Sequence, residues 1–360
     1  MKQGNDPQLN PTINDIARVA EVSLATVDRV LNARPGVREA TVQKVNQAIA
    51  DLGYVRDAAA ANLARGRVYN FVFILPSNKN EFLLSLETQI EQLNAGLRHE
   101  RTRLSFVHVA AFDPVALAVA IDAIDVTRVD GVAIFGPETP SVRDSVAHLK
   151  KNGVTVVSLV ADIPSSERDH YIGVDNVAAG RTAAQLLGRF LGTRRGEVLV
   201  LTGSMLARDH LERRLGFDEV MGRDFPHLRV LASLEGRDDP RLIERLMPDV
   251  LSDNSDIIGI YSSAAGNEGL LRFLATEPAL ENPVVVAHEL TPLSRNALNR
   301  GLFDAVISQD SGHLVRSAVR IMRANSDRMP INMAQERIRI DVYLKENMPP
   351  DAVPNWEANP

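Results

Sequence analysis

The residue types that most often perform chemistry in proteins are sparse in this chain, and they lack catalytic spacing. The 360 residues include no cysteine and only eight histidines, which excludes thiol nucleophiles, thiolate metal sites and disulfides. His288 and Glu289 begin a zinc-helix pattern, but the second histidine that such a helix needs does not follow. There is no glycine-rich phosphate loop and no nucleophile elbow. We therefore expect a protein that is not an enzyme and that holds no cofactor and no metal.

Side chains suited to reading another molecule gather instead near the N-terminus, on one face of a predicted helix. After a capping Ser23, the apolar residues Val27, Val30 and Leu31 recur with helical spacing and define an inner face. The outer face carries small, charged and amide side chains, namely Ala25, Asp28, Arg29 and Asn32.

Two further helices are predicted to brace this one. Thr12 and Asp15 are placed to cap the first helix, and Gly53 stands where the third should end. Two short helices with a minimal turn and a third bracing helix form a helix-turn-helix module, whose second helix enters the major groove of DNA. Periodicity alone leaves open a three-helix bundle that does not bind DNA.

The residues themselves favour the DNA-binding alternative. The segments TINDIARVA (12–20), VSLATVDRVLN (22–32), RPGV (34–37) and LGY (52–54) closely resemble the head of the lac-repressor family. The resemblance implies a sequence-specific DNA-binding transcriptional regulator, most simply a repressor. It also implies a helix-turn-helix domain over residues 12–57.

The resemblance also assigns roles by position. Leu24 and Ala25 stand where the family reads base edges, and Arg29 stands at a further base contact, where guanidinium and guanine pair well. Asp28 replaces the serine most common in the family. An acidic side chain beside phosphates weakens DNA binding unless it accepts a hydrogen bond from a cytosine amino group or pairs with a nearby arginine. The positions that match phosphate contacts are Thr12, Ser23, Thr26 and Asn32.

Residues 58–68 form an alanine-rich segment that is helix-prone but too short to be stable alone. By itself this segment reads as a linker. The resemblance implies instead a hinge helix that forms on DNA, with Leu63 wedged into the minor groove.

From residue 69 onward, apolar runs of strand length alternate with amphipathic helical segments, which predicts parallel sheets covered by helices. The length favours two α/β lobes: an N-lobe of residues 69–170 and 310–332, and a C-lobe of residues 171–308 and 333–345. Residues 346–360 form a tail without a heptad repeat, which argues against a tetramerising coiled coil. The predicted strands are 71–75, 104–109, 131–135, 154–159, 198–202, 257–261, 284–287 and 305–308.

This body resembles the type I periplasmic sugar-binding fold that the family joins to its heads. The resemblance implies an effector site between the lobes, at the carboxyl ends of the strands. Carboxylates, amides, an arginine and an aromatic ring suit a neutral sugar or polyol; a purine or another metabolite is the alternative. For Asp175 and Asn176, a helix N-cap is the favoured interpretation. The predicted effector contacts are Asn80, Phe82, Asp162, Arg213, Glu289 and Gln309.

Charge and composition are consistent with such a regulator. The net charge of the chain is −6, but residues 1–68 alone have a net charge of +2, so a slightly basic head precedes an acidic body. No apolar run is long enough to span a bilayer, and residues 1–10 lack the apolar stretch of a signal peptide. We expect a cytoplasmic homodimer that binds a near-palindromic operator and no membrane. These features disfavour a transporter-linked solute-binding protein, and the missing catalytic groups disfavour a sugar-modifying enzyme.

Overall fold

The computed structural model describes residues 11–31, 34–54, 67–78, 80–264, 266–276, 280 and 282–350. The chain forms two compact units, Met1–Arg67 and Val68–Pro360, which we call the head and the body. Asn32 and Leu63, with most of the expected hinge segment, lie outside the described residues. Their assigned roles therefore stay predictions.

The head contains three helices, and their ends follow the sequence signals. Thr12 Oγ1 accepts from the Asp15 amide and the Asp15 carboxylate accepts from the Thr12 amide, a reciprocal capping box. Ser23 Oγ accepts from the Thr26 amide at 3.2 Å. Gly53 ends the last helix at a φ of 62°, a left-handed conformation that favours glycine. The helices are α1 (Ile13–Val19), α2 (Leu24–Leu31) and α3 (Glu39–Leu52).

One small core holds the three head helices together. Glu21 adopts a φ of 56° and makes the sharp turn between α1 and α2. Because all three helices direct apolar side chains inward, the opposite face of α2 remains at the surface. The buried core residues are Ile16, Ala20, Val27, Val45 and Ala48.

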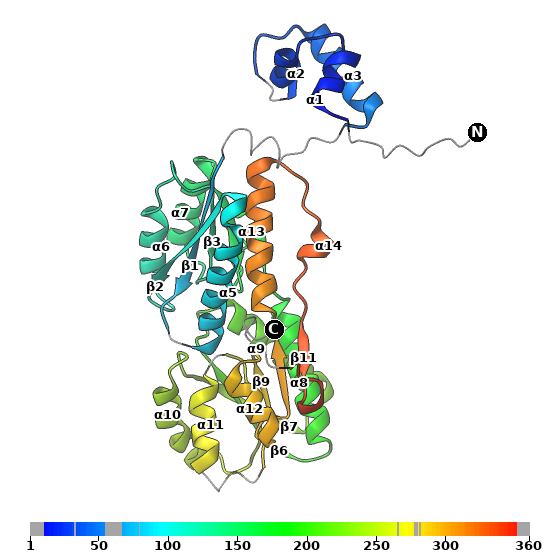
Figure 1. Ribbon diagram of the computed structural model, residues 1–360. Helices are drawn as coiled ribbons and strands as arrows, with labels where there is room; N and C mark the ends of the chain where they lie inside the picture. Colours follow the sequence, from blue (N-terminus) through cyan, green and yellow to red (C-terminus); the bar gives the residue numbers. More distant parts are fainter. Residues whose placement is uncertain are drawn as a thin grey trace, which may run out of the picture. The chain divides into compact units, whose positions relative to one another are not determined.

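The first lobe of the body, the N-lobe, contains a five-stranded parallel sheet in the order β2-β1-β3-β4-β5. Its strands are β1 (Tyr69–Pro76), β2 (Thr102–Val109), β3 (Gly131–Ile134), β4 (Thr155–Leu159) and β5 (His170–Ile172). Helices cover both faces (Figure 1). One face carries α5 (Glu81–Leu97) and α13 (Ser311–Asp327), the other α6 (Pro114–Asp122) and α7 (Pro140–Lys151), and the short helix η1 (Arg98–Glu100) follows α5.

The C-lobe contains a six-stranded sheet in the order β11-β10-β9-β8-β6-β7, parallel except for β11. Its strands are β6 (Gly196–Thr202), β7 (Leu228–Glu235), β8 (Ile257–Ser262), β9 (Val284–His288), β10 (Ala305–Ser308) and β11 (Asp341–Tyr343). One face packs against α8 (Asn176–Leu191) and α9 (Arg208–Asp224), and the other against α10 (Pro240–Asp253), α11 (Asn267–Thr276) and α12 (Pro292–Arg300). The short α14 (Met333–Glu336) and η2 (Lys345–Asn347) complete the body.

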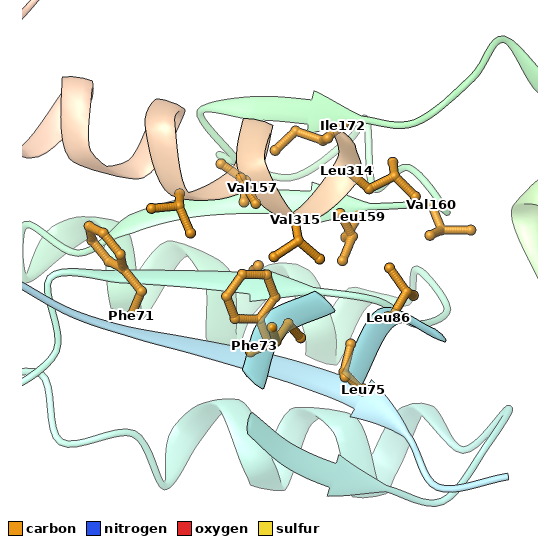
Figure 2. Close-up of a cluster of buried hydrophobic side chains, with 14 of the residues drawn as sticks. Phe71, Phe73, Leu75, Leu86, Val157, Leu159, Val160, Ile172, Leu314 and Val315 are labelled. Carbon is orange, nitrogen blue, oxygen red and sulfur yellow. The ribbon is translucent and has the colours of Figure 1, made fainter. Parts of the chain in front are cut away.

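Figure 2 shows how the N-lobe core is built from alternate residues of a strand. Phe71, Phe73 and Leu75 of β1 point to the same side and meet Leu314 and Val315 of α13. Successive side chains of a strand face opposite sides of the sheet, so the residues between them enter the second N-lobe core beneath α6 and α7. Both faces of β1 are therefore buried, as the near-continuous apolar run predicts.

Three segments connect the lobes: residues 172–176, 308–311 and 336–341. The first follows Ile172, two residues beyond the expected boundary, because β5 pairs with β4. The last lies later than residue 333, because Ile338 still packs in the N-lobe core. No helix formed by the described residues has the length and apolar character needed to cross a bilayer.

Candidate functional site

The outer face of α2 presents the residues that the sequence predicts as base readers. Leu24 is 50% exposed, and Ala25 and Arg29 are exposed as well, whereas Val27 on the inner face is fully buried. Hydroxyl groups lie at the starts of α1 and α2, where backbone amides also point outward. Thr12 Oγ1 donates to Asp15 at 2.7 Å, and Ser23 Oγ lies 2.9 Å from Thr26 Oγ1.

Asp28, the unusual acid of this helix, has a cationic neighbour. Arg34 Nη1 lies 3.3 Å from Asp28 Oδ2. Pairing with a nearby arginine is one of the two arrangements that permit an acid close to phosphates. Because both side chains are about half exposed, the ion pair contributes little to the free energy of unfolding. Its main effect is to offset the negative charge of Asp28 on the surface of α2.

The body contains a cavity between its lobes, of about 60 Å³. Its walls are the loops that follow β1, β2, β3 and β4 in the N-lobe and β6, β7, β8 and β9 in the C-lobe, together with the N-terminal turns of α5 and α9. All these loops leave the carboxyl ends of parallel strands, the usual position of ligand sites in open α/β sheets.

Arg213 lies at the centre of the C-lobe wall and is only 3% exposed. Its Nε donates to Asn176 Oδ1 at 2.9 Å, and its Nη1 donates to the Ser263 carbonyl at 2.8 Å. Its Nη2 lies 3.7 Å from Glu289 Oε1. The guanidinium therefore joins three strand-to-helix segments. Asp175 caps α8 through the Ala178 amide, as expected, while its neighbour Asn176 holds this arginine.

A close crossing of α8 and α9 fixes the position of Arg213. A methyl group at Gly180 of α8 would lie 1.9 Å from the Arg213 carbonyl oxygen, and one at Gly216 of α9 would lie 2.0 Å from that of Val177. No side chain larger than hydrogen fits at either contact, so the two backbones touch.

Glu289 provides a buried carboxyl beside this arginine. It follows β9, is 5% exposed and has a φ of 67°, a strained conformation for a residue with a Cβ. Gln309 Nε2 donates to Glu289 Oε1 at 3.0 Å. Burial raises the pKa of the Glu289 carboxyl, and Arg213 opposes that rise. Glu289 Oε2 and Gln309 Oε1 have no hydrogen-bond partner among the described residues.

Four polar residues of the cavity were not singled out from the sequence. Asp209 is 3% exposed, and its Oδ1 lacks a hydrogen-bond partner in the part of the chain that the structure describes. Its Oδ2 lies 3.6 Å from Nε2 of His210. Asn78 Nδ2 donates across the cavity to Asp238 at 3.1 Å. Asp209 precedes Arg213 by four residues, and this helical spacing was the available signal.

The remaining predicted contacts divide into two groups. Asn80 and Phe82 line the cavity, although Asn80 Oδ1 is occupied in capping α5 through the Leu83 amide. Asp162 does not line it. Its carboxylate pairs with Arg168 at 2.6 Å and accepts from Ser158 at 2.8 Å. Because Asp162 is held in this ion pair outside the cavity, we leave it out of the site.

Backbone strain is concentrated around the cavity. Of the nine non-glycine residues with positive φ in the described chain, four line it: Phe112, Val160, Asp238 and Glu289. Val160, a β-branched residue at 64°, is held there because its carbonyl accepts from Tyr171 at 2.9 Å. Strain of this kind persists only where the surrounding contacts enforce it, and it is typical of functional sites.

Contacts across the mouth tie the two lobes. Besides the Asn78–Asp238 bond, Arg208 of α9 lies 3.8 Å from Glu138 of the N-lobe, and the Leu293 amide donates to Glu81 at 3.2 Å. Within the described ranges, no three His, Asp or Glu side chains are grouped so that they could hold a metal ion. The cavity lining combines hydrogen-bonding groups, charged groups and the aromatic rings of Phe82, Phe112 and Phe135.

Comparison with known proteins matches both units. Residues 71–327 match the periplasmic binding protein domain, and residues 12–57 match bacterial regulatory proteins of the lacI family. Catabolite control protein A of Priestia megaterium is 30% identical over 186 residues, which are 50% of this chain and 52% of that protein. The HTH-type transcriptional regulator GntR of Pseudomonas aeruginosa is 31% identical over 223 residues, 58% and 57% of the two chains. The match thus spans about half the length of these relatives.

Among solved structures, a glucose-galactose binding protein of Geobacillus stearothermophilus, GanP, superimposes with a TM-score of 0.70 at 19% identity. The superposition covers 79% of this chain and 99% of that one, and it supports the two-lobed fold. The matched ranges coincide with the three-helix head and the two-lobed body. The chain belongs to the periplasmic binding protein domain family through residues 71–327, and its residues 12–57 match the model of the lacI family of bacterial regulatory proteins.

Proposed function

We propose that this protein is a sequence-specific DNA-binding transcriptional regulator, a repressor, controlled by a small molecule bound between the lobes of its body. The observation that carries the first half is the exposed outer face of α2, with Leu24, Ala25 and Arg29 opposite a buried Val27. A helix held by its inner face alone is free to enter a major groove. The regulator acts as a cytoplasmic homodimer on a near-palindromic operator.

The DNA contacts divide by chemistry. Arg29 is suited to a bidentate contact with guanine, and Leu24 and Ala25 are suited to thymine methyl groups. The hydroxyl groups of Thr12, Ser23 and Thr26 are suited to phosphates, which fix register without reading sequence. Specificity should therefore depend on Arg29, and general affinity on the hydroxyl groups.

The direct test is selection of a duplex from a random library by the full chain, followed by titration of the Arg29→Ala variant. We expect enrichment of a near-palindromic sequence. Arg29→Ala should weaken binding to it by about 1–3 kcal/mol per half-site and leave binding to unrelated duplex nearly unchanged. Fluorescence anisotropy measures both affinities. A library without enrichment, or an equal loss on both duplexes, would contradict the proposal.

The second half of the proposal concerns the ligand, which we infer to be a neutral, hydroxyl-rich molecule such as a monosaccharide or polyol. The buried cavity-lining atoms without partners in the described chain are Asn78 Oδ1, Asp209 Oδ1 and Glu289 Oε2, all of them oxygens. A buried oxygen without a donor costs about 1–3 kcal/mol. A ligand that supplies several hydrogen-bond donors removes this cost.

Charge argues against an acidic ligand. The cavity wall holds the carboxyl groups of Asp209, Asp238 and Glu289 against one guanidinium, that of Arg213. Arg213 is also already engaged by Asn176, Ser263 and Glu289. A phosphorylated or carboxylated sugar would meet more negative than positive charge. The aromatic faces of Phe112 and Phe135 are suited to the apolar face of a sugar ring.

A thermal-shift panel tests the ligand class. It contains neutral monosaccharides and polyols, the corresponding sugar phosphates and sugar acids, and adenine and guanine. We expect a neutral member to raise the Tm by several degrees, since ligand at 100 Kd adds about 2.7 kcal/mol. The same member should have no effect on Asp209→Ala. A purine, phosphate or acid as the strongest stabiliser would replace the proposed class.

A further inference from the structure

A second hollow of the body has the opposite chemistry to the ligand cavity. It lies where η1 and β2 begin, beside Val68, the first residue of the body. Arg98, Arg101 and Arg103 line it and are exposed. The rest of its lining is Val68, Asn70, Asn94, Thr102, Leu104 and Ser105. No carboxyl group is among these residues, although residues 69–360 carry a net charge of −8.

Among the residues that the structure describes, the three guanidinium groups have no ion-pair partner. No hydrogen bond or ion pair of their side chains occurs within the described part of the chain. The nearest acid in sequence, Glu100, pairs with Arg323 of α13 at 2.5 Å. Asn94 Oδ1 accepts from the Leu104 amide at 2.9 Å, which leaves its amide nitrogen available as a donor. The hollow therefore offers donors and positive charge, the chemistry that binds phosphate oxygens.

A backbone hydrogen bond joins this hollow to the start of β1, where the chain enters the body from the head. The Tyr69 amide donates to the Arg101 carbonyl at 2.9 Å. Arg101 itself has a φ of 53°, so the turn between η1 and β2 is sharply defined. Because the chain passes from the head into the body at Val68, any DNA that the head binds is tethered to this end of the body.

We propose that Arg98, Arg101 and Arg103 form an accessory contact between the body and the phosphate backbone of bound DNA. This inference rests on the proposed function, because the head must deliver the DNA. The contact reads no bases. It adds affinity that is independent of sequence and sensitive to salt, since each phosphate contact releases condensed counterions.

The test uses the full chain and a triple variant, Arg98→Ala/Arg101→Ala/Arg103→Ala. Binding to the duplex selected by the unaltered protein, and to an unrelated duplex of equal length, is titrated at several salt concentrations. We expect the slope of log Kd against log salt to fall by roughly one for each arginine that contacts a phosphate. Affinity should fall by the same factor on both duplexes, with the Tm and the ligand-induced shift unchanged.

A matched control removes the same charge elsewhere. Arg241, Arg245 and Arg300 are exposed on α10 and α12, and no ion pair of theirs occurs in the described chain. Their triple alanine variant should keep the original slope. An unchanged slope in the first variant, or equal slopes in the two variants, overturns the inference while the proposed function stands. A change in oligomeric state in light scattering also overturns it and assigns the arginines to a subunit contact. If the unaltered protein binds no duplex, both proposals fail.

Discussion

At the scale of single residues, Glu289 lies in the cavity wall at a cost in stability. Burial raises the pKa of its carboxyl above the ordinary 4.5. A carboxyl whose pKa is raised in the folded state stabilises the fold at pH values below its pKa in the unfolded chain. This stabilisation is lost as the pH rises through the pKa of the folded state. Glu289→Gln removes the ionisation and keeps an oxygen for Gln309. We therefore expect the Tm of Glu289→Gln, relative to the unaltered protein, to be higher at pH 7.5 than at pH 4.5.

Circular dichroism of the ligand-free protein at the two pH values measures this difference. Glu91→Gln, which alters an exposed carboxyl on α5 outside the cavity, is the control. A relative Tm for Glu289→Gln that is equal or lower at pH 7.5 would show that Arg213 outweighs burial at this site.

The residue scale also shows what sequence can and cannot predict. Arg213 and Glu289 are placed in the cavity wall, and Gln309 behind them, where the family resemblance positions them. Asp162 lies outside the cavity, where its carboxylate forms an ion pair with Arg168. No sequence pattern distinguishes an acidic residue held in such an ion pair from one that is available to a ligand. Asp209 was missed because its burial depends on how α9 meets the sheet. The contacts in the site remain predictions until binding is measured.

At the scale of elements, the crossing of α8 and α9 should control the geometry of Arg213. Gly180→Ala places a methyl group 1.9 Å from the Arg213 carbonyl oxygen, so the helices must separate. We expect a Tm lower by several degrees and weakened ligand binding, because the bond from Arg213 to Asn176 is displaced. Gly222→Ala on α9, where a methyl group meets nothing within 4 Å, is the control.

Gly222→Ala should be neutral or should stabilise by about 0.5–1 kcal/mol, since alanine favours a helix interior. Thermal unfolding of both variants, with and without ligand, separates the two expectations. Tolerance of Gly180→Ala, with ligand binding intact, would mean that the crossing does not position Arg213.

The elements themselves follow unevenly from the sequence. All eight apolar runs are strands. Most of them are buried on both faces, which needs continuous apolar residues, whereas the edge strand β2 is buried only in part. Three strands were not foreseen. β5 and β11 have only three residues each, and β7 is an edge strand whose burial is mixed. Pairing with a neighbouring strand, which sequence does not reveal, defines these three.

At the scale of the whole molecule, the proposed function couples two sites, the DNA-binding face of α2 and the cavity between the lobes. Contacts across the mouth, such as Asn78 with Asp238 and Arg208 with Glu138, tie the lobes. A ligand that adds bonds to both walls favours the closed arrangement. A change in lobe orientation can alter DNA binding only if the two arrangements differ in their affinity for DNA.

The most direct measurement of this coupling titrates the selected duplex with the full chain, with and without the strongest stabiliser from the ligand panel. The same pair is then measured in reverse, as ligand affinity with and without saturating duplex. We expect each partner to change the affinity of the other by the same factor, typically about 5–150-fold, or about 1–3 kcal/mol. Operator affinity that is identical with and without bound ligand would contradict this coupling.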